Sequence, residues 1–121
     1  MTRHKFAREG IRVKNNHFFE VDSLVWDEQV VVTWMFEFSA KSILGVASNI
    51  RREEDGWLSA EIEWSDSQAA EQAKTLLDAK DVQFTVYCSD VIFEKGKSLH
   101  VSKARIRAVS LAIYARLWEE Q

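Results

Sequence analysis

Apolar and polar residues alternate along several segments of the chain, a pattern typical of β-strands that bury one face. Segment 57–64 is the plainest case, since its even positions are apolar and positions 59, 61 and 63 are polar. We expect it to pair with Ile43–Arg51 in a hairpin whose turn is Glu54-Asp55-Gly56, because Asp-Gly suits tight turns. One face of this hairpin should be exposed to solvent.

Other strands are predicted on both sides of this hairpin. Val30–Phe38 is apolar on nearly both faces, which predicts a central strand. Val82–Phe93 is expected to form a long strand that ends before a turn at Gly96. Leu99–Trp118 is ambiguous, because its second half fits either a strand or a closing helix; we favour a strand through about Ile113.

The remaining elements are short. Ile11–Val13 and Phe18–Val21 are expected to form a hairpin around Asn15-Asn16, a pair that tolerates positive φ. A helix is predicted near residues 66–80, with Ser65 and Gln68 as a capping box. Its apolar residues recur at helical spacing, at Ala69, Ala73, Leu76 and Leu77. The pattern predicts an α+β fold of mainly antiparallel β structure, about seven strands in a partly closed sheet or barrel, with one packed helix.

Composition favours one domain, residues 1–121, since 121 residues can bury a core without disulfides and no proline- or glycine-rich linker occurs. No apolar run approaches the roughly 20 residues that span a bilayer. The first ten residues hold no hydrophobic signal region, so we expect synthesis in the cytoplasm of the host. The single cysteine, Cys88, and the separated histidines His4, His17 and His100 match no zinc-ligand spacing. We expect no metal or other cofactor.

The charge is uneven along the chain. The net charge of −3 argues against a dedicated nucleic-acid binder. Residues 1–16 are nevertheless mainly basic, whereas residues 53–66 are acidic and contain no basic residue. We expect residues 1–8 to form a flexible basic arm that docks on an acidic neighbour, such as segment 53–66 of another copy. A frayed, solvated terminus is the alternative.

One stretch carries a resemblance to a known family. Leu44–Trp64, read as LGVASNIRREEDGWLSAEIEW, is followed by the helix, the strand VQFTVYC at Val82–Cys88 and a late Ala-Val-Ser-Leu-Ala strand. This order resembles the head maturation (prohead) proteases of tailed bacteriophages over about Thr33–Ile113. The resemblance implies a fold like that of herpesvirus assembly proteases.

The positions that match the family's catalytic residues hold other residues. The resemblance places its histidine base at Phe36, its serine nucleophile at Thr85 and an acidic residue at Ala108. A hydroxyl is a poor nucleophile unless a base takes its proton, and phenylalanine cannot do so. Losing members of such a triad lowers the rate by roughly 10⁴ to 10⁶.

Other candidate catalytic groups are weaker. Cys88 and His100 on neighbouring late strands are the best improvised Cys/His pair, although a lone strand cysteine is commonly a small buried hydrophobe. Glu61 and Glu63 share one strand face at about 7 Å, as paired carboxylates would, but alternating acids on a solvated strand explain them as well. Gly45 is better explained by close strand packing than by a cofactor site.

Five tryptophans among fourteen aromatic residues favour an interaction role. Trp34 and Trp64 are expected in the core. The interface candidates are Arg3, Lys5, Arg8, Trp26, Trp57 and Trp118.

We therefore expect a non-enzymatic structural protein of a phage particle on a prohead-protease-like fold. It would be a decoration or cement protein located in the virion and bound to the major capsid protein or another virion protein. We expect it to assemble as a homo-oligomer such as a trimer. We expect it to bind no membrane and no specific nucleic acid. The alternatives are an active serine/threonine-type maturation protease with a rearranged site at Thr85 or Cys88, and a small regulatory binding module.

Overall fold

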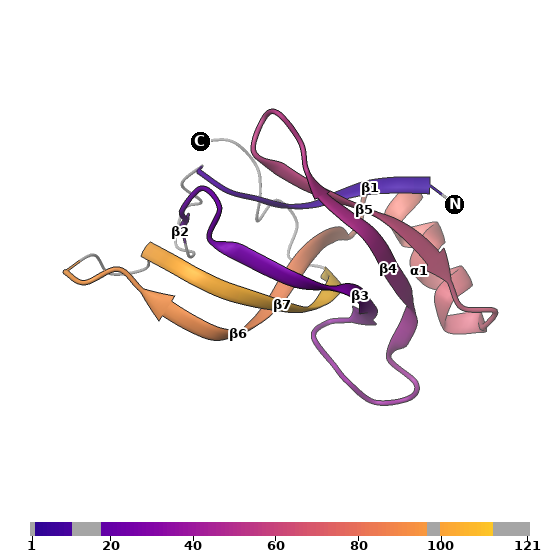
Figure 1. Cartoon of the computed structure of the whole chain (residues 1–121). Helices are drawn as coiled ribbons and strands as arrows, with labels where there is room; N and C mark the ends of the chain where they lie inside the picture. The colour runs from indigo at the N-terminus through magenta and orange to yellow at the C-terminus, as the bar shows by residue number, and fades with distance from the viewer. Residues whose placement is uncertain (1, 11–17, 97–99, 113–121) are drawn as a thin grey trace.

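The computed structural model describes residues 2–10, 18–96 and 100–112. Within these residues the chain forms seven strands and one helix (Figure 1). In chain order the elements are β1 (Thr2–Arg8), β2 (Phe18–Phe19), β3 (Leu24–Trp34), β4 (Ile43–Arg52), β5 (Trp57–Trp64), α1 (Gln68–Asp78), β6 (Gln83–Phe93) and β7 (His100–Ala112). This confirms the predicted α+β fold with one helix.

All seven strands belong to one sheet, ordered β1-β5-β4-β3-β7, with β6 and β2 also paired to β7. Both β2 and β3 run parallel to β7, whereas the β6–β7 pair is antiparallel. The outer strands β1 and β6 come together where the ring of His4 lies 5.1 Å from the ring of Phe84. The sheet therefore curls into a half-barrel, and α1 lies at one end of it (Figure 1).

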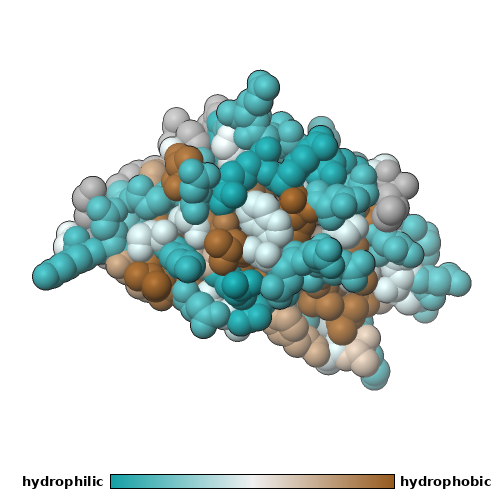
Figure 2. Space-filling model, viewed as in Figure 1, coloured by the Kyte–Doolittle hydropathy of each residue, from teal (hydrophilic) through white to brown (hydrophobic). Residues whose placement is uncertain are grey.

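The core fills the inside of this curl. It is built from the apolar positions of every long strand together with the buried face of α1, and its largest fully buried side chains are Phe6, Leu24, Leu44, Leu58, Ile62, Ile106 and Leu111. The outside is largely hydrophilic in the view of Figure 2, where apolar residues form separate patches. Among the described residues, no helix combines the length and the apolar character needed to cross a membrane.

The central strand is longer and differently placed than predicted. β3 begins at Leu24 and ends at Trp34, so the prediction of strand structure through Phe38 is wrong. The chain leaves the strand because Met35 and Phe36 adopt φ values of 52° and 64°. β3 lies between β4 and β7, which confirms that it is central.

The β4–β5 hairpin forms as predicted, and Gly56 in its turn has a φ of 89°. Its outer face is less exposed than expected, since Ser59 is only 1% exposed and contacts both Arg3 and Glu53 through hydrogen bonds. Close strand packing at Gly45 is also confirmed, because a Cβ there would lie 2.3 Å from the Glu63 carbonyl oxygen.

The cap of the helix lies two residues later than predicted. Ser67, rather than Ser65, accepts a hydrogen bond from the Ala70 amide at 3.1 Å. The apolar stripe is confirmed in part: Ala73 is buried, while Ala69, Leu76 and Leu77 pack against the core from partly buried positions. The helix ends at Asp78.

The predicted strand in the segment Leu99–Trp118 is confirmed for β7, His100–Ala112. Residues 113–118, including Trp118, lie outside the described residues. Ile11–Val13 and Asn15-Asn16 of the expected N-terminal hairpin lie outside them too. Phe18–Phe19 is a strand, but it pairs in parallel with β7.

Candidate functional site

Three positions singled out by the protease resemblance, Phe36, Thr85 and Ala108, meet around Ser110 of β7. The Phe36 amide donates a hydrogen bond to Ser110 Oγ at 2.8 Å. Thr85 of β6 is the cross-strand partner of Ser110. Ala108 precedes Ser110 by two residues, so the two share a face of the strand. Residues distant in sequence thus form one compact site on the outer face of the sheet.

The turn that brings Phe36 to this site is strained. Met35 and Phe36 both lie in the left-handed region, which costs a non-glycine residue roughly 1–2 kcal/mol. Two hydrogen bonds to β7 hold the turn: the Met35 amide donates to the Leu111 carbonyl at 2.8 Å, and the Phe36 amide donates to Ser110. Such strain persists only where the surrounding structure fixes it, and it commonly marks functional sites.

The hydroxyl groups of the site are buried. Thr33 and Ser110 are 0% exposed and Thr85 is 5% exposed. Thr33 Oγ1 lies 3.3 Å from Ser110 Oγ, which also lies 3.4 Å from the Thr33 carbonyl oxygen. Ser110 was not predicted to be a site residue, although it is the serine of the late Ala-Val-Ser-Leu-Ala strand. The Thr33 and Ser110 hydroxyls thus bond to each other and to the backbone.

No histidine of the described residues is placed to activate them. The His4 ring packs on Phe84, which faces the opposite side of β6 from its neighbour Thr85. His100 stacks on Phe18 at 4.8 Å between ring centroids, at the start of β7. Among the residues that the structure describes, these hydroxyl groups therefore have no histidine base beside them.

The improvised Cys88–His100 pair does not form. Cys88 pairs with Ile106, and His100 lies six residues earlier in β7. At the rise of a β-strand this separation is about 20 Å. Burial also raises the pKa of the Cys88 thiol to about 12, so the thiolate that a nucleophile requires is scarce at neutral pH.

An exposed aromatic pair lies next to the site, on the same face of β6 as Thr85. Tyr87 is the cross-strand partner of Ala108 and shares the face of Thr85. The Phe38 ring lies 5.1 Å from the Tyr87 ring at an interplanar angle of 64°. Phe38 is 51% exposed and Tyr87 is 42% exposed. We call Phe36, Phe38 and Tyr87 the aromatic face.

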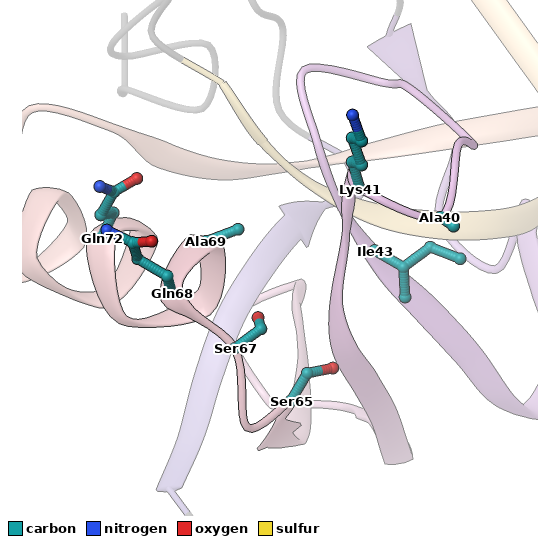
Figure 3. Close-up of a pocket in the computed structure, with 8 residues that line it drawn as sticks. All are labelled: Ala40, Lys41, Ile43, Ser65, Ser67, Gln68, Ala69 and Gln72. Atoms are coloured by element: carbon teal, nitrogen blue, oxygen red, sulfur yellow. The ribbon is translucent and has the colours of Figure 1, made fainter.

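A groove lies between the β3–β4 loop and α1 (Figure 3). It has a volume of about 680 Å³ and is lined by Ala40, Lys41, Ile43, Ser65, Ser67, Gln68, Ala69 and Gln72. In Figure 3 the helix residues lie opposite Ala40 and Ile43, with Ser65 and Ser67 between them. A second cavity of 220 Å³ shares Lys41, Ala69 and Gln72 and reaches Trp34 and Leu76.

The expected flexible arm is instead strand β1, which corrects the prediction for residues 1–8. β1 pairs antiparallel with β5 of the same chain. Arg3 donates to Ser59 at 2.9 Å and lies 3.8 Å from Glu61, and Lys5 lies 3.4 Å from Asp55. The basic segment does meet the acidic segment 53–66, but within one chain.

Two of the tryptophan candidates, Trp26 and Trp57, also make contacts within the chain. Lys5 and Arg8 lie over the Trp57 ring at 5.8 and 5.4 Å, and Arg52 lies over the Trp26 ring at 4.8 Å. Such cation–π contacts stabilise exposed aromatic rings by about 0.5–1 kcal/mol. Phe38 and Tyr87 were missed in the sequence because nothing in its pattern distinguishes exposed from buried aromatics.

Family models, curated proteins and solved structures all gave no match to this chain.

Proposed function

We propose that this chain is a non-enzymatic protein that binds another protein through its aromatic face. The observation that carries the proposal is the Phe38–Tyr87 pair, in which two large rings contact each other while each stays about half exposed. Aromatic side chains of this kind dominate the binding energy of protein interfaces. A partner that covers the pair removes both rings from water.

The loop that presents Phe38 is ordered before any partner arrives. The Ser42 hydroxyl donates to the Glu37 carboxylate at 2.7 Å and lies 2.9 Å from the Ser39 hydroxyl. The Trp34 amide donates to the Ser42 carbonyl at 2.9 Å. Because these bonds fix the loop, binding loses little further conformational entropy, which favours affinity.

The neighbouring chemistry supports binding over catalysis. Thr85 and Ser110 are buried hydroxyls, and the position that matches the family's base is the phenylalanine Phe36. An active hydrolase needs a base within hydrogen-bond reach of its nucleophile. The aromatic face thus occupies the place where the resemblance would put a catalytic site.

The resemblance to phage head proteases makes the proposal more specific. The partner is then the major capsid protein or another virion protein, and the chain is a decoration or cement protein that adds to the head as a homo-oligomer such as a trimer. Lys41, an exposed residue of the same β3–β4 loop that lines the groove, would meet an acidic group of that partner.

The test is binding to heads assembled from the major capsid protein of the same genome. Sedimentation of the added chain with these heads measures the affinity and the copy number. Phe38→Ala and Tyr87→Ala should each weaken binding by about 30-fold or more, as expected for hot-spot residues. Phe93→Ala is the matched control, because Phe93 is also exposed, at 49%, but lies at the far end of β6; it should change the affinity less than twofold.

Two results would defeat the proposal. Absence of the chain from mature particles, measured by quantitative mass spectrometry, excludes a decoration protein. Cleavage of the scaffold or capsid protein by the purified chain, abolished in Thr85→Val or Cys88→Ser, establishes the protease alternative instead.

A further inference from the structure

A cluster of two carboxylates and one imidazole forms at the far end of the half-barrel from α1. Glu20 follows β2, Glu94 follows β6, and His100 begins β7. One potential ligand atom from each residue lies within 4.8 Å of the other two, and each residue is half-buried. The cluster shares no residue with the aromatic face or the groove.

The backbone brings all three residues to the start of β7. The Glu94 amide donates to the His100 carbonyl at 2.8 Å, and the Glu20 amide donates to the Val101 carbonyl at 3.0 Å. These bonds fix the positions from which the two carboxylates reach inward. The ligand atoms are therefore supported by sheet pairing, as a preorganised site requires.

The imidazole is oriented as well. Its ring stacks on Phe18 with centroids 4.8 Å apart, and its Nδ1 lies 3.3 Å from Glu20 Oε1. This 3.3 Å separation is already that of two ligand atoms held by one tetrahedral ion.

We propose that Glu20, Glu94 and His100 bind one divalent transition-metal ion, with zinc the best match. One imidazole nitrogen and two carboxylate oxygens suit zinc, whereas calcium and magnesium prefer all-oxygen sets. A tetrahedral zinc ion with bonds of about 2.0–2.1 Å holds its ligand atoms about 3.3 Å apart. The three ligand atoms lie within 4.8 Å of one another, and rotation of the side chains brings them to this shorter spacing. They then fill three positions around the ion, and water takes the fourth.

The ion links β2 to the β6–β7 end of the sheet, which β2 otherwise joins through a short strand pairing. β2 contributes two residues to the sheet, at Phe18 and Phe19. A metal bond from Glu20 to Glu94 and His100 cross-links this short strand to the β6–β7 end. Because the unfolded chain holds no such preformed site, binding the ion stabilises the folded state.

The test is titration of the purified chain with zinc chloride, followed by calorimetry and by the thermal unfolding midpoint. We expect one zinc ion per chain and a midpoint that rises with zinc concentration. His100→Ala and Glu94→Gln should weaken zinc binding at least about tenfold and remove the rise in midpoint. His4→Gln and Glu63→Gln are matched controls outside the cluster and should bind zinc as the unaltered chain does.

Two outcomes would overturn the proposal. The first is no zinc binding by the unaltered chain. The second is zinc binding that survives both His100→Ala and Glu94→Gln but disappears in Cys88→Ser, which would assign the ion to the thiol. Glu94→Gln keeps the size and shape of the side chain, so its result stands even if His100→Ala disturbs folding; circular dichroism checks both variants.

Discussion

Glu9 and Arg52 form an ion pair whose acidic member is 3% exposed. Arg52 Nε lies 2.8 Å from Glu9 Oε1, and the Leu24 amide donates to Glu9 Oε2 at 2.9 Å. Arg52 also donates to the Leu24 carbonyl at 2.6 Å. The hydrogen bond to Glu9 raises the pKa of Arg52, which therefore stays charged. The pair joins the ends of β1 and β4 to the beginning of β3.

Removing Arg52 should destabilise the fold strongly, because Glu9 would remain buried without its counter-charge. We expect Arg52→Met to lower the free energy of unfolding by about 3–5 kcal/mol, measured by urea denaturation at pH 7. The double variant Glu9→Leu with Arg52→Met should recover most of the loss. Arg51→Met is the control, since Arg51 is an exposed neighbour, and it should change stability by less than about 0.5 kcal/mol. Equal losses in the two single arginine variants would contradict the role of the buried pair.

Ser110 should matter for stability through the strained turn. Its Oγ accepts the Phe36 amide at 2.8 Å, so Ser110→Ala leaves that amide without its acceptor. We expect a loss of about 1–3 kcal/mol in the free energy of unfolding. Ser102→Ala, at an exposed position of the same strand, should cost less than about 1 kcal/mol. A Ser110→Ala variant as stable as the unaltered chain would show that the turn is held by other contacts.

His4 should make stability depend on pH between neutral and mildly acidic conditions. Burial lowers the pKa of His4 below its usual 6.5, although the charge of Asp78 acts in the opposite direction. Below pH 6.5 the unfolded chain therefore binds a proton at this residue that the folded chain does not, so stability is full above pH 6.5 and falls as the pH decreases through the folded-state pKa.

Urea denaturation at pH 7.5 and pH 5.5 tests this. The unaltered chain should lose more stability over that interval than His4→Gln, because the substitution removes the titrating group. An identical loss in both chains would assign the dependence to other groups. Glu53, whose pKa is lowered by the Ser59 hydroxyl and then by Arg51, acts only below its usual value of 4.5 and so lies outside the interval.

Cys88 should be nearly inert in the folded chain. Because burial raises the pKa of its thiol to about 12, little thiolate exists at pH 8. The rate of iodoacetamide labelling is measured by mass spectrometry. It should be at least about a hundredfold slower in the folded chain than in the chain unfolded in about 6 M urea, where the thiol has its ordinary pKa. Comparable rates in the folded and unfolded chain would show that β6 opens readily.

The sequence predicted the strands because alternation reports directly on burial. The apolar positions of 57–64 face the core as expected, and the Asp55-Gly56 turn forms the hairpin. Alternation carries no information on strand partners, so the parallel pairing of β3 with β7 was not predicted. The positive φ of Met35 and Phe36 was also missed, since neither residue type favours that conformation.

The candidate sites were less predictable because they depend on contacts between distant segments. The charge pattern predicted that residues 1–8 dock on an acidic neighbour such as segment 53–66 of another copy, whereas Thr2–Arg8 pairs with β5 of its own chain. Glu20, Glu94 and His100 come from three elements, so no local ligand spacing reveals their cluster. Cys88 and His100, in contrast, lie close in sequence yet at distant points of the β6–β7 pair.

The position of β7 in the sheet has a consequence for folding during synthesis. β7 pairs with β2, β3 and β6, and all the other described strands precede it in the chain. While the ribosome is still adding residues 100–112, β3 and β6 each lack a neighbour and expose edges that invite pairing with other chains. The half-barrel is therefore completed only when its middle strand emerges, and a nascent chain stalled before this point is the form of the protein most exposed to aggregation.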